Sequence, residues 1–184
     1  SHVTNAAREE VWMSNADIIS GLRWTSTLDG RTSAVCRARD GKIYAIGEGP
    51  RPPAHVRCRS VMVPVLDGVG ILGNRPTVTD TRTRAEREVD FRLLAKLNKI
   101  SVQAARAKWA ADNVGSTPLE TTYNTFLRRQ SNAFQDEVLG KTKAELFRKG
   151  GLNLDVFVDK AGNELSLDQL RKKQPDAWQK AFAA

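Results

Sequence analysis

Residues 24–36 of this chain read WTSTLDGRTSAVC, residues 40–44 read DGKIY, and residues 52–60 read PPAHVRCRS. The three stretches hold both cysteines of the chain and one of its two histidines, namely Cys36, Cys58 and His55. Residue types that bind metals are otherwise scattered along the sequence. Their collection in one short module predicts a local cross-link, a metal site or a catalytic site.

Local patterns predict a small hairpin-centred α/β module over residues 1–66. Apolar residues at helical spacing indicate an N-terminal helix, and a glycine ends it. The Asp40-Gly41 pair supplies the positive φ of a tight turn, which favours a β-hairpin around it. The expected elements are a helix over 3–20 ended by Gly21, strands at 22–26 and 59–65, and a hairpin over 35–46.

The rest of the chain predicts a loop or linker over residues 67–83 and then a mainly helical lobe with a short strand hairpin over residues 84–184. The linker is rich in Gly, Thr and Asp, and the lobe has helical periodicity and two capping patterns. The fold class is therefore α+β. The expected elements are a helix over 84–111 that a break near 99–101 would divide in two, a helix from Thr117 to Gln130, a helix over 132–147, a strand at 154–158, and a helix over 167–173 after a capping box at Ser166 and Gln169.

The chain carries a net charge of +8 over 184 residues, and the first module is its most basic part. From Arg23 to Arg59, eight Lys and Arg residues stand against three Asp and Glu. A basic surface attracts phosphate backbones without reading sequence, although a solvated basic face is the alternative. No apolar run approaches the ~20 residues needed to cross a bilayer, so we expect a soluble protein with no membrane partner. The candidate nucleic-acid contacts are Arg31, Arg37, Arg39, Lys42, Arg57 and Arg59, the last two on one face of a strand.

The cysteines and the histidine form a candidate zinc site. His55 and Cys58 lie three positions apart in a loop, Cys36 would be the third ligand, and Asp29 or water the fourth. A disulfide between the two cysteines is an alternative in an oxidising environment. The third alternative is a pair of partly buried thiols, with His55 hydrogen-bonded to the backbone.

Two enzymatic readings are weaker. No small-residue motif around either cysteine supports a Cys–His nucleophile. A metal-dependent nuclease could use His55, Asp29 and Asp40, but a second general base is lacking. Aspartate beside Gly30 is more often a turn residue that caps its own loop, with Arg31 paired to a nearby carboxylate. We therefore expect a protein that is not an enzyme, with a nuclease or effector-like domain acting on nucleic acid as the runner-up.

The order W-x-S-T-x-D-x-R-T-x-x-x-C, then D-G-K-x-Y, then P-P-x-H-x-x-C-R resembles the phage Mu F-like minor head proteins of the phage head morphogenesis family. The likeness covers residues 8–66, and a second stretch, 123–151, resembles the C-terminal lobe of some members. Many members have further cysteines at the positions of Ser33 and Ser60.

The resemblance implies a structural virion component that acts in head assembly, DNA packaging or DNA ejection. It implies portal and capsid proteins as partners and double-stranded DNA as a further candidate, with no small-molecule substrate. It also implies location in the virion, and in the host cytoplasm during assembly. The match lies in the C-terminal part of the family pattern, so we expect a piece of a longer protein.

Overall fold

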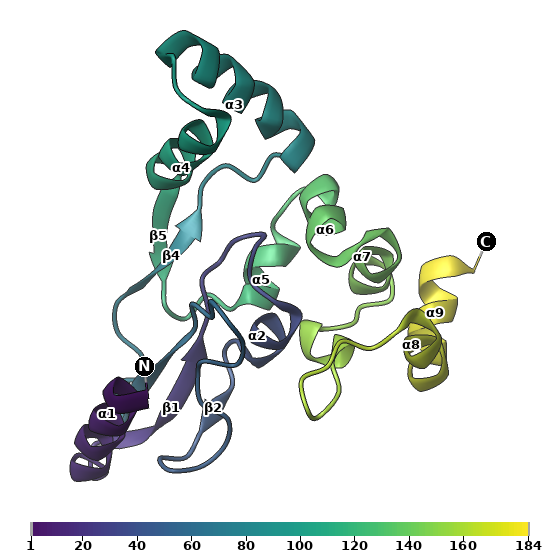
Figure 1. The fold of residues 1–184 in the computed structure, drawn as a ribbon. Helices are drawn as coiled ribbons and strands as arrows, with labels where there is room; N and C mark the ends of the chain where they lie inside the picture. The colour runs from purple at the N-terminus through teal and green to yellow at the C-terminus, as the bar shows by residue number, and fades with distance from the viewer. Residues whose placement is uncertain (1, 184) are drawn as a thin grey trace.

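A computed structural model describes residues 2–183, which form a three-stranded and a two-stranded antiparallel sheet with helices around them (Figure 1). The expected α+β class is confirmed. Within the described residues, no helix is both long and apolar enough to span a lipid bilayer.

The N-terminal module is built on a sheet with the strand order β2-β1-β3. Its strands are β1 (Ile19–Thr25), β2 (Ile43–Tyr44) and β3 (Val61–Leu66), and α1 (His2–Ser14) precedes them. The expected helix over 3–20 is therefore correct for its first part and wrong after residue 14. Gly21 lies within β1, where a Cβ would sit 2.6 Å from Cγ2 of Ile43, so its role is close strand packing rather than helix termination.

The hairpin expected over residues 35–46 is wrong, because residues Ala34–Arg39 form helix α2. Alanine and arginine favour helix, and the two β-favouring residues of this segment are too few to outweigh them. Ser33 adopts the extended conformation of an N-cap before the helix. Gly41 does have the expected positive φ, of 85°, but its turn joins α2 to β2.

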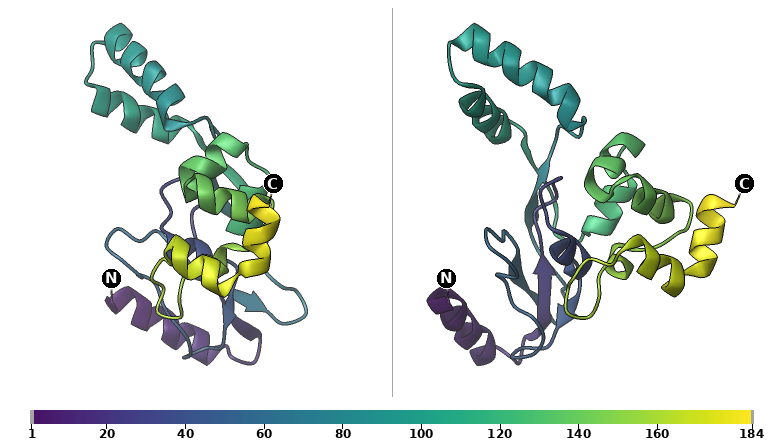
Figure 2. Two further views of the ribbon diagram at one scale, coloured as in Figure 1. Left: turned by 90° about the vertical axis from the view of Figure 1, so that its right-hand side faces the viewer. Right: turned by 45° about the vertical axis from the view of Figure 1, so that its right-hand side comes forward.

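A β-ribbon and a helical hairpin follow. Strand β4 (Asn74–Val78) pairs with β5 (Val114–Pro118), and α3 (Arg84–Asn98) and α4 (Val102–Asp112) lie between them in the chain. The hairpin projects from the rest of the molecule at the end of this ribbon (Figures 1 and 2). Phe91, Ala95 and Ala105 form its own small core, with Trp109 packed against them.

This region both confirms and corrects the sequence prediction. The break near residue 99 is confirmed, because Lys99 takes a left-handed conformation and ends α3. The segment 67–83, expected to be loop or linker, contains β4. Thr117, expected as an N-cap, lies in β5, and the following helix is capped by Thr122 instead.

The C-terminal lobe packs short helices around a core of its own. Gly140, with φ 78°, divides the single helix expected over 132–147. The strand expected at 154–158 is mostly a 3-10 helix, whereas the capping box of Ser166 and Gln169 is confirmed. The elements are α5 (Tyr123–Arg128), α6 (Asn132–Leu139), α7 (Lys141–Arg148), η1 (Leu154–Phe157), α8 (Leu167–Lys173) and α9 (Pro175–Phe182), the last not expected from the sequence.

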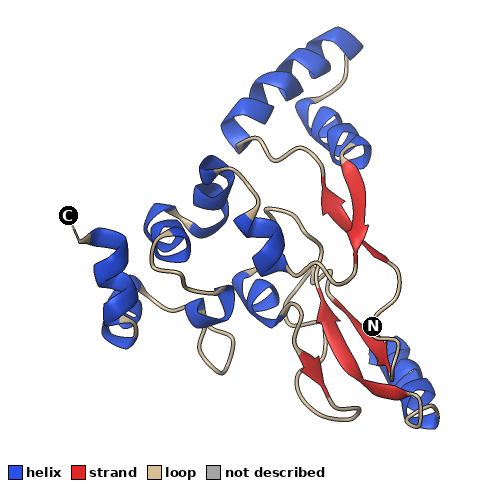
Figure 3. Ribbon diagram, turned by 180° about the vertical axis from the view of Figure 1, so that it is seen from behind, coloured by secondary structure: helices blue, strands red, loops and turns tan. Residues whose placement is uncertain are grey.

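The parts are joined at the loop that follows β1. Leu28 of this loop is fully buried in the core of the C-terminal lobe, while its backbone pairs with that of Pro76 and Val78 in β4. The β4–β5 ribbon thus lies between the three-stranded sheet and the helical hairpin (Figure 3). The motif stretch of residues 24–36 is the point at which sheet, ribbon and lobe meet.

Candidate metal centre and its ionic support

Cys36, His55 and Cys58 come together in the structure, as the sequence predicted. Their ligand atoms all lie within 4.8 Å of one another. Sγ of Cys36 is 3.3 Å from Nε2 of His55 and 3.6 Å from Sγ of Cys58, and both cysteines are free thiols. Helix α2 supplies the buried Cys36, and the loop before β3 supplies the exposed His55 and the half-buried Cys58.

The His55 ring is held in the orientation of a metal ligand. Its Nδ1 lies 2.8 Å from the carbonyl oxygen of Val56. Because a carbonyl only accepts, Nδ1 donates, and a neutral imidazole then keeps its lone pair on Nε2. Metal-binding histidines commonly have this backbone contact on the nitrogen away from the metal. The same hydrogen bond was expected for the alternative of two partly buried thiols with no metal, and that contact is confirmed.

The two separations that involve Cys36 Sγ fit zinc. With Zn–S about 2.3 Å and Zn–N about 2.1 Å, a tetrahedral ion separates two sulfurs by about 3.8 Å and a sulfur from a nitrogen by about 3.6 Å. The observed separations of 3.6 Å and 3.3 Å are within a few tenths of an ångström of these values. Ser33 Oγ lies 2.8 Å from Nε2 of His55, so a hydroxyl or a water at this position is the available fourth ligand.

The two thiols differ in acidity. Burial raises the pKa of Cys36. Burial acts in the same direction at Cys58, but hydrogen bonds with the backbone of Ala54 and Ser60, and with the Ser60 and Cys36 side chains, lower the pKa of Cys58 below its usual value.

Asp29, the fourth ligand considered from the sequence, does not join the cluster. Its carboxylate accepts two hydrogen bonds from Arg59, of 2.6 and 2.8 Å, and others from the Arg31 backbone and the Thr32 hydroxyl. Burial would raise the pKa of Asp29, but the contacts with Arg59 and Arg31 outweigh it and lower the pKa. The expected turn-capping role, with Arg31 paired to a carboxylate 3.5 Å away, is confirmed.

A second aspartate of the motif, Asp40, is the centre of a buried ionic network. Its side chain is fully buried and forms a salt bridge with Arg75 of β4. It also accepts hydrogen bonds from the backbone N–H groups of Ser26 and Tyr123, at 2.7 and 2.6 Å. Arg75 donates in turn to the carbonyl oxygens of Ser26 and Thr121. One ion pair therefore ties the motif to the ribbon and to the C-terminal lobe.

Two serines complete the packing around the thiols. Ser26 Oγ donates to the carbonyl oxygen of Cys36 at 3.1 Å and lies 2.9 Å from Ser60 Oγ. Nε1 of the fully buried Trp24 donates to Ser26 Oγ. The Trp–Ser pair of the motif thus fixes the backbone from which Cys36 extends.

Three of the six candidate nucleic-acid contacts lie around one small cavity. Arg31, Arg57 and Arg59 line a small cavity together with Cys36 and His55. Arg57 has φ 60° and precedes the strand, so the expectation that Arg57 and Arg59 share a strand face is wrong. The others lie on or after α2: Arg37 donates to the Thr32 carbonyl, Arg39 lies over the Trp24 ring, and Lys42 pairs with Asp155.

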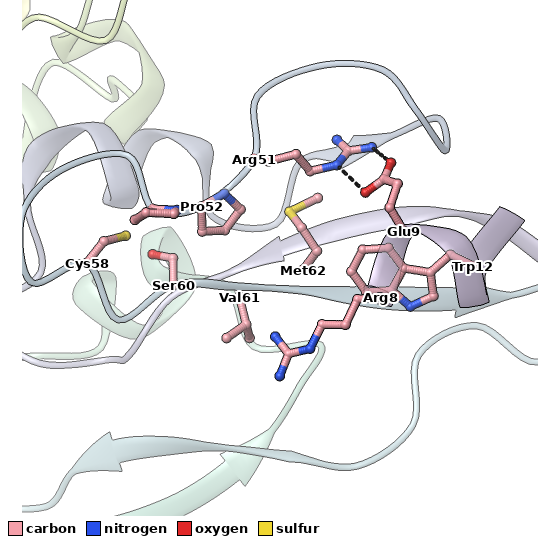
Figure 4. A pocket seen from close by; sticks show the side chains of 10 residues that line it. Arg8, Glu9, Trp12, Arg51, Pro52, Cys58, Ser60, Val61 and Met62 are labelled. Atoms are coloured by element: carbon pink, nitrogen blue, oxygen red, sulfur yellow. Dashed lines mark hydrogen bonds and ion pairs between the residues drawn. The ribbon is translucent and has the colours of Figure 1, made fainter. Parts of the chain in front are cut away.

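A second cavity, of about 200 Å³, reaches Cys58. Cys58 and Ser60 lie at one end of it, and Trp12 of α1 at the other (Figure 4). Arg51 and Glu9 close one wall through an ion pair of 3.0 Å. This cavity gives solvent a route to the Cys58 sulfur.

Sequence reasoning missed Arg75 and Tyr123, which complete the network around the motif. Tyr123 is fully buried, and its hydroxyl donates to the carbonyl oxygen of Asp29 at 2.6 Å. Both residues are distant in sequence from the residues they contact, and no local pattern marks either one.

Comparison with known proteins adds no further guide, since no family model, curated protein or solved structure matches this chain.

Proposed function

We propose that this chain is a non-enzymatic structural component of a tailed-phage or prophage head, a minor head protein that binds portal and capsid proteins. Double-stranded DNA is a further candidate partner. The observation that carries this proposal is the ionic network centred on Asp40, in which the motif residues serve to join three parts of the fold.

The resemblance of residues 8–66 to the Mu F-like pattern supports the proposal, and the positions of two departures add to it. Ser33 and Ser60 stand where many members have cysteine, and both contact the thiol cluster. Because both departures from the pattern lie at the thiol cluster, their position in the fold is consistent with a cross-linking site. We therefore include zinc as a structural ion held by Cys36, His55 and Cys58.

The contacts of the acidic residues favour binding over the nuclease alternative. A metal-dependent nuclease needs carboxylates that are free to hold an ion near the scissile phosphate. Asp29 is engaged by Arg59 and Asp40 by Arg75, so both acids are already neutralised by arginine.

Co-expression with the portal protein encoded in the same genome tests the proposal. We expect the two proteins to co-purify in a fixed ratio. In parallel, the purified chain is incubated with linear double-stranded DNA and Mg²⁺ at 50 and 200 mM salt, where we expect salt-sensitive binding and intact DNA. Two results together would favour the nuclease alternative instead: no complex with the portal protein, and divalent-metal-dependent DNA cleavage that is lost in His55→Ala.

A further inference from the structure

A cleft of about 490 Å³ opens between the helical hairpin and the motif loop. The loop around Gly30 forms one wall, and the ribbon and the inner faces of α3 and α4 form the other. Glu137 of α6 closes one end, where it accepts hydrogen bonds from the Arg84 backbone N–H and from the Arg87 side chain. The cleft therefore lies where the projecting hairpin meets the body of the protein.

The floor of the cleft is apolar. It is formed by side chains of the ribbon and the hairpin, among them Val78, Phe91, Trp109, Ala110 and Val114. Phe91 and Trp109 belong to the hairpin's own core, whereas Val114 is 60% exposed and Ala110 is half-buried, so the floor is accessible chiefly at these last two residues. An open apolar floor next to a charged rim is typical of a site that receives a side chain from a partner.

The rim is strongly basic. It is lined by five arginines and two carboxylates, Asp29 and Glu137. Five arginines against two carboxylates give the lining a net charge of +3. Arg106 is also paired with Glu88 outside the lining, at 2.7 Å, which leaves an excess of two positive charges around the cleft. Arg31 is 75% exposed and only 3.5 Å from its nearest carboxylate oxygen, so its other donors are accessible from solvent. The five arginines are Arg31, Arg59, Arg84, Arg87 and Arg106.

We propose that this cleft docks an acidic segment of a partner protein, with one bulky apolar side chain on the floor and flanking carboxylates against the arginines. The inference deepens the proposed function and rests on it, because it names the chemistry of the segment that a portal or capsid protein would present. Arginine pairs with carboxylates through two parallel hydrogen bonds, and buried apolar anchors supply most of the affinity of such contacts.

The aromatic residues of the cleft favour a protein segment over nucleic acid. Bases stack on free aromatic faces, and phosphates alone make no use of an apolar floor. Arg87 lies over the Trp109 ring at 5.0 Å, and Phe91 packs edge-on against the same ring at 5.5 Å. These contacts occupy the ring on which a base would stack.

Fluorescence anisotropy with a labelled synthetic peptide tests the proposal. The probe is a peptide of about twelve residues with one central phenylalanine flanked by aspartates and glutamates. We expect it to bind the full chain at low salt and to lose at least about tenfold in affinity when its phenylalanine is replaced by glycine or its acids by amides. A duplex DNA oligonucleotide of equal charge should compete weakly.

Two variants of the cleft are compared with matched controls. Ala110→Trp fills the floor, and Arg84→Glu with Arg106→Glu reverses part of the rim; each should weaken the peptide about tenfold or more. Ala107→Trp on α4, and Arg92→Glu with Lys96→Glu on α3, introduce the same changes outside the cleft lining and should leave affinity unchanged. Thermal unfolding of each variant confirms that it is folded.

The result that would overturn the proposal is no binding, equal binding without the phenylalanine, or equal loss in the control variants. Strong competition by DNA would assign the cleft to nucleic acid instead. Failure of the proposed function is distinguishable from failure of the cleft. If the portal complex forms equally well with Ala110→Trp, the docking role of the cleft is wrong and the proposed function stands. If the peptide binds but no portal complex forms, the head-protein function is wrong.

Discussion

Asp40 and Arg75, 35 positions apart in the sequence, form a salt bridge whose side chains are 0% and 1% exposed. The carboxylate belongs to the turn after α2, and the guanidinium extends from β4, so the pair joins the module to the ribbon. Because the carboxylate also accepts from the backbone of Tyr123, the C-terminal lobe depends on the same group. This arrangement makes Asp40 the residue on which the three parts depend most directly.

Asp40→Asn should be strongly destabilising. It leaves the guanidinium of Arg75 buried and unpaired, and breaking a buried pair costs roughly 3–5 kcal/mol. Urea unfolding measures the free energy of unfolding. The control is Asp90→Asn, whose ion pair with Arg82 is about half exposed on both sides and should cost less than about 1 kcal/mol. Equal losses in the two variants would contradict a special role for the buried pair.

The double variant Asp40→Leu with Arg75→Met should regain only part of the lost stability. Removing both charges avoids the unpaired guanidinium. The backbone N–H groups of Ser26 and Tyr123 still lose their acceptor, and an unsatisfied buried donor costs about 1–3 kcal/mol. Full recovery in urea unfolding would mean that the ion pair matters and the backbone contacts do not.

The chain should carry one zinc ion when it is purified without chelator. Native mass spectrometry reports the bound ion, and it also shows a disulfide as a loss of two hydrogens. We expect His55→Ala and Cys58→Ser to lose the ion, whereas Asp29→Asn keeps it because Asp29 contacts Arg59 instead of the cluster. The bare reduced mass of the wild-type chain would remove zinc from the proposed function.

Ser33→Cys should tighten zinc binding by at least about tenfold. The serine hydroxyl already lies 2.8 Å from Nε2 of His55, and a third thiolate is a stronger ligand for zinc than a hydroxyl or water. Competition with a coloured chelator measures the affinity. Ser116→Cys, which adds a thiol on the exposed edge of β5, is the matched control and should leave the affinity unchanged.

Features with a local cause could be predicted from the sequence. The three candidate metal ligands are near one another in the chain, and the structure does bring them together. The capping box at Ser166 and the break before α4 also depend on neighbouring residues alone. Local chemistry was misleading at residues 35–38, where a short β-favouring pair was outweighed by helix-forming neighbours.

Features that depend on distant partners could not be predicted. The ribbon of β4 and β5 pairs segments separated by the whole helical hairpin, and neither segment has a strand-like alternation of apolar residues. Arg75 reads as an exposed charge in the sequence, yet it is buried because Asp40 lies opposite. Asp29 is a second example. It was considered as a metal ligand because its ion pair with Arg59 could not be foreseen, since Arg59 was expected on a strand face.

Acid should weaken the attachment of the helical hairpin through Asp80. Hydrogen bonds from Arg82, together with one from Trp109 Nε1, lower the pKa of Asp80 from 3.8 to about 2. A carboxyl whose pKa is lower when folded stabilises the protein above about pH 4 and loses that contribution as pH falls toward 2. Asp80→Asn should therefore lower the free energy of unfolding by roughly 1 kcal/mol at pH 7, a small loss because solvent screens the half-exposed Arg82. The loss should become progressively smaller in acid. Urea unfolding of both proteins between pH 7 and pH 2.5 measures this; Asp112→Asn, at an exposed pair with Lys108, is the control. A difference between wild type and Asp80→Asn that stays constant with pH would show that hydrogen-bond geometry, and not the charge of Asp80, holds the hairpin.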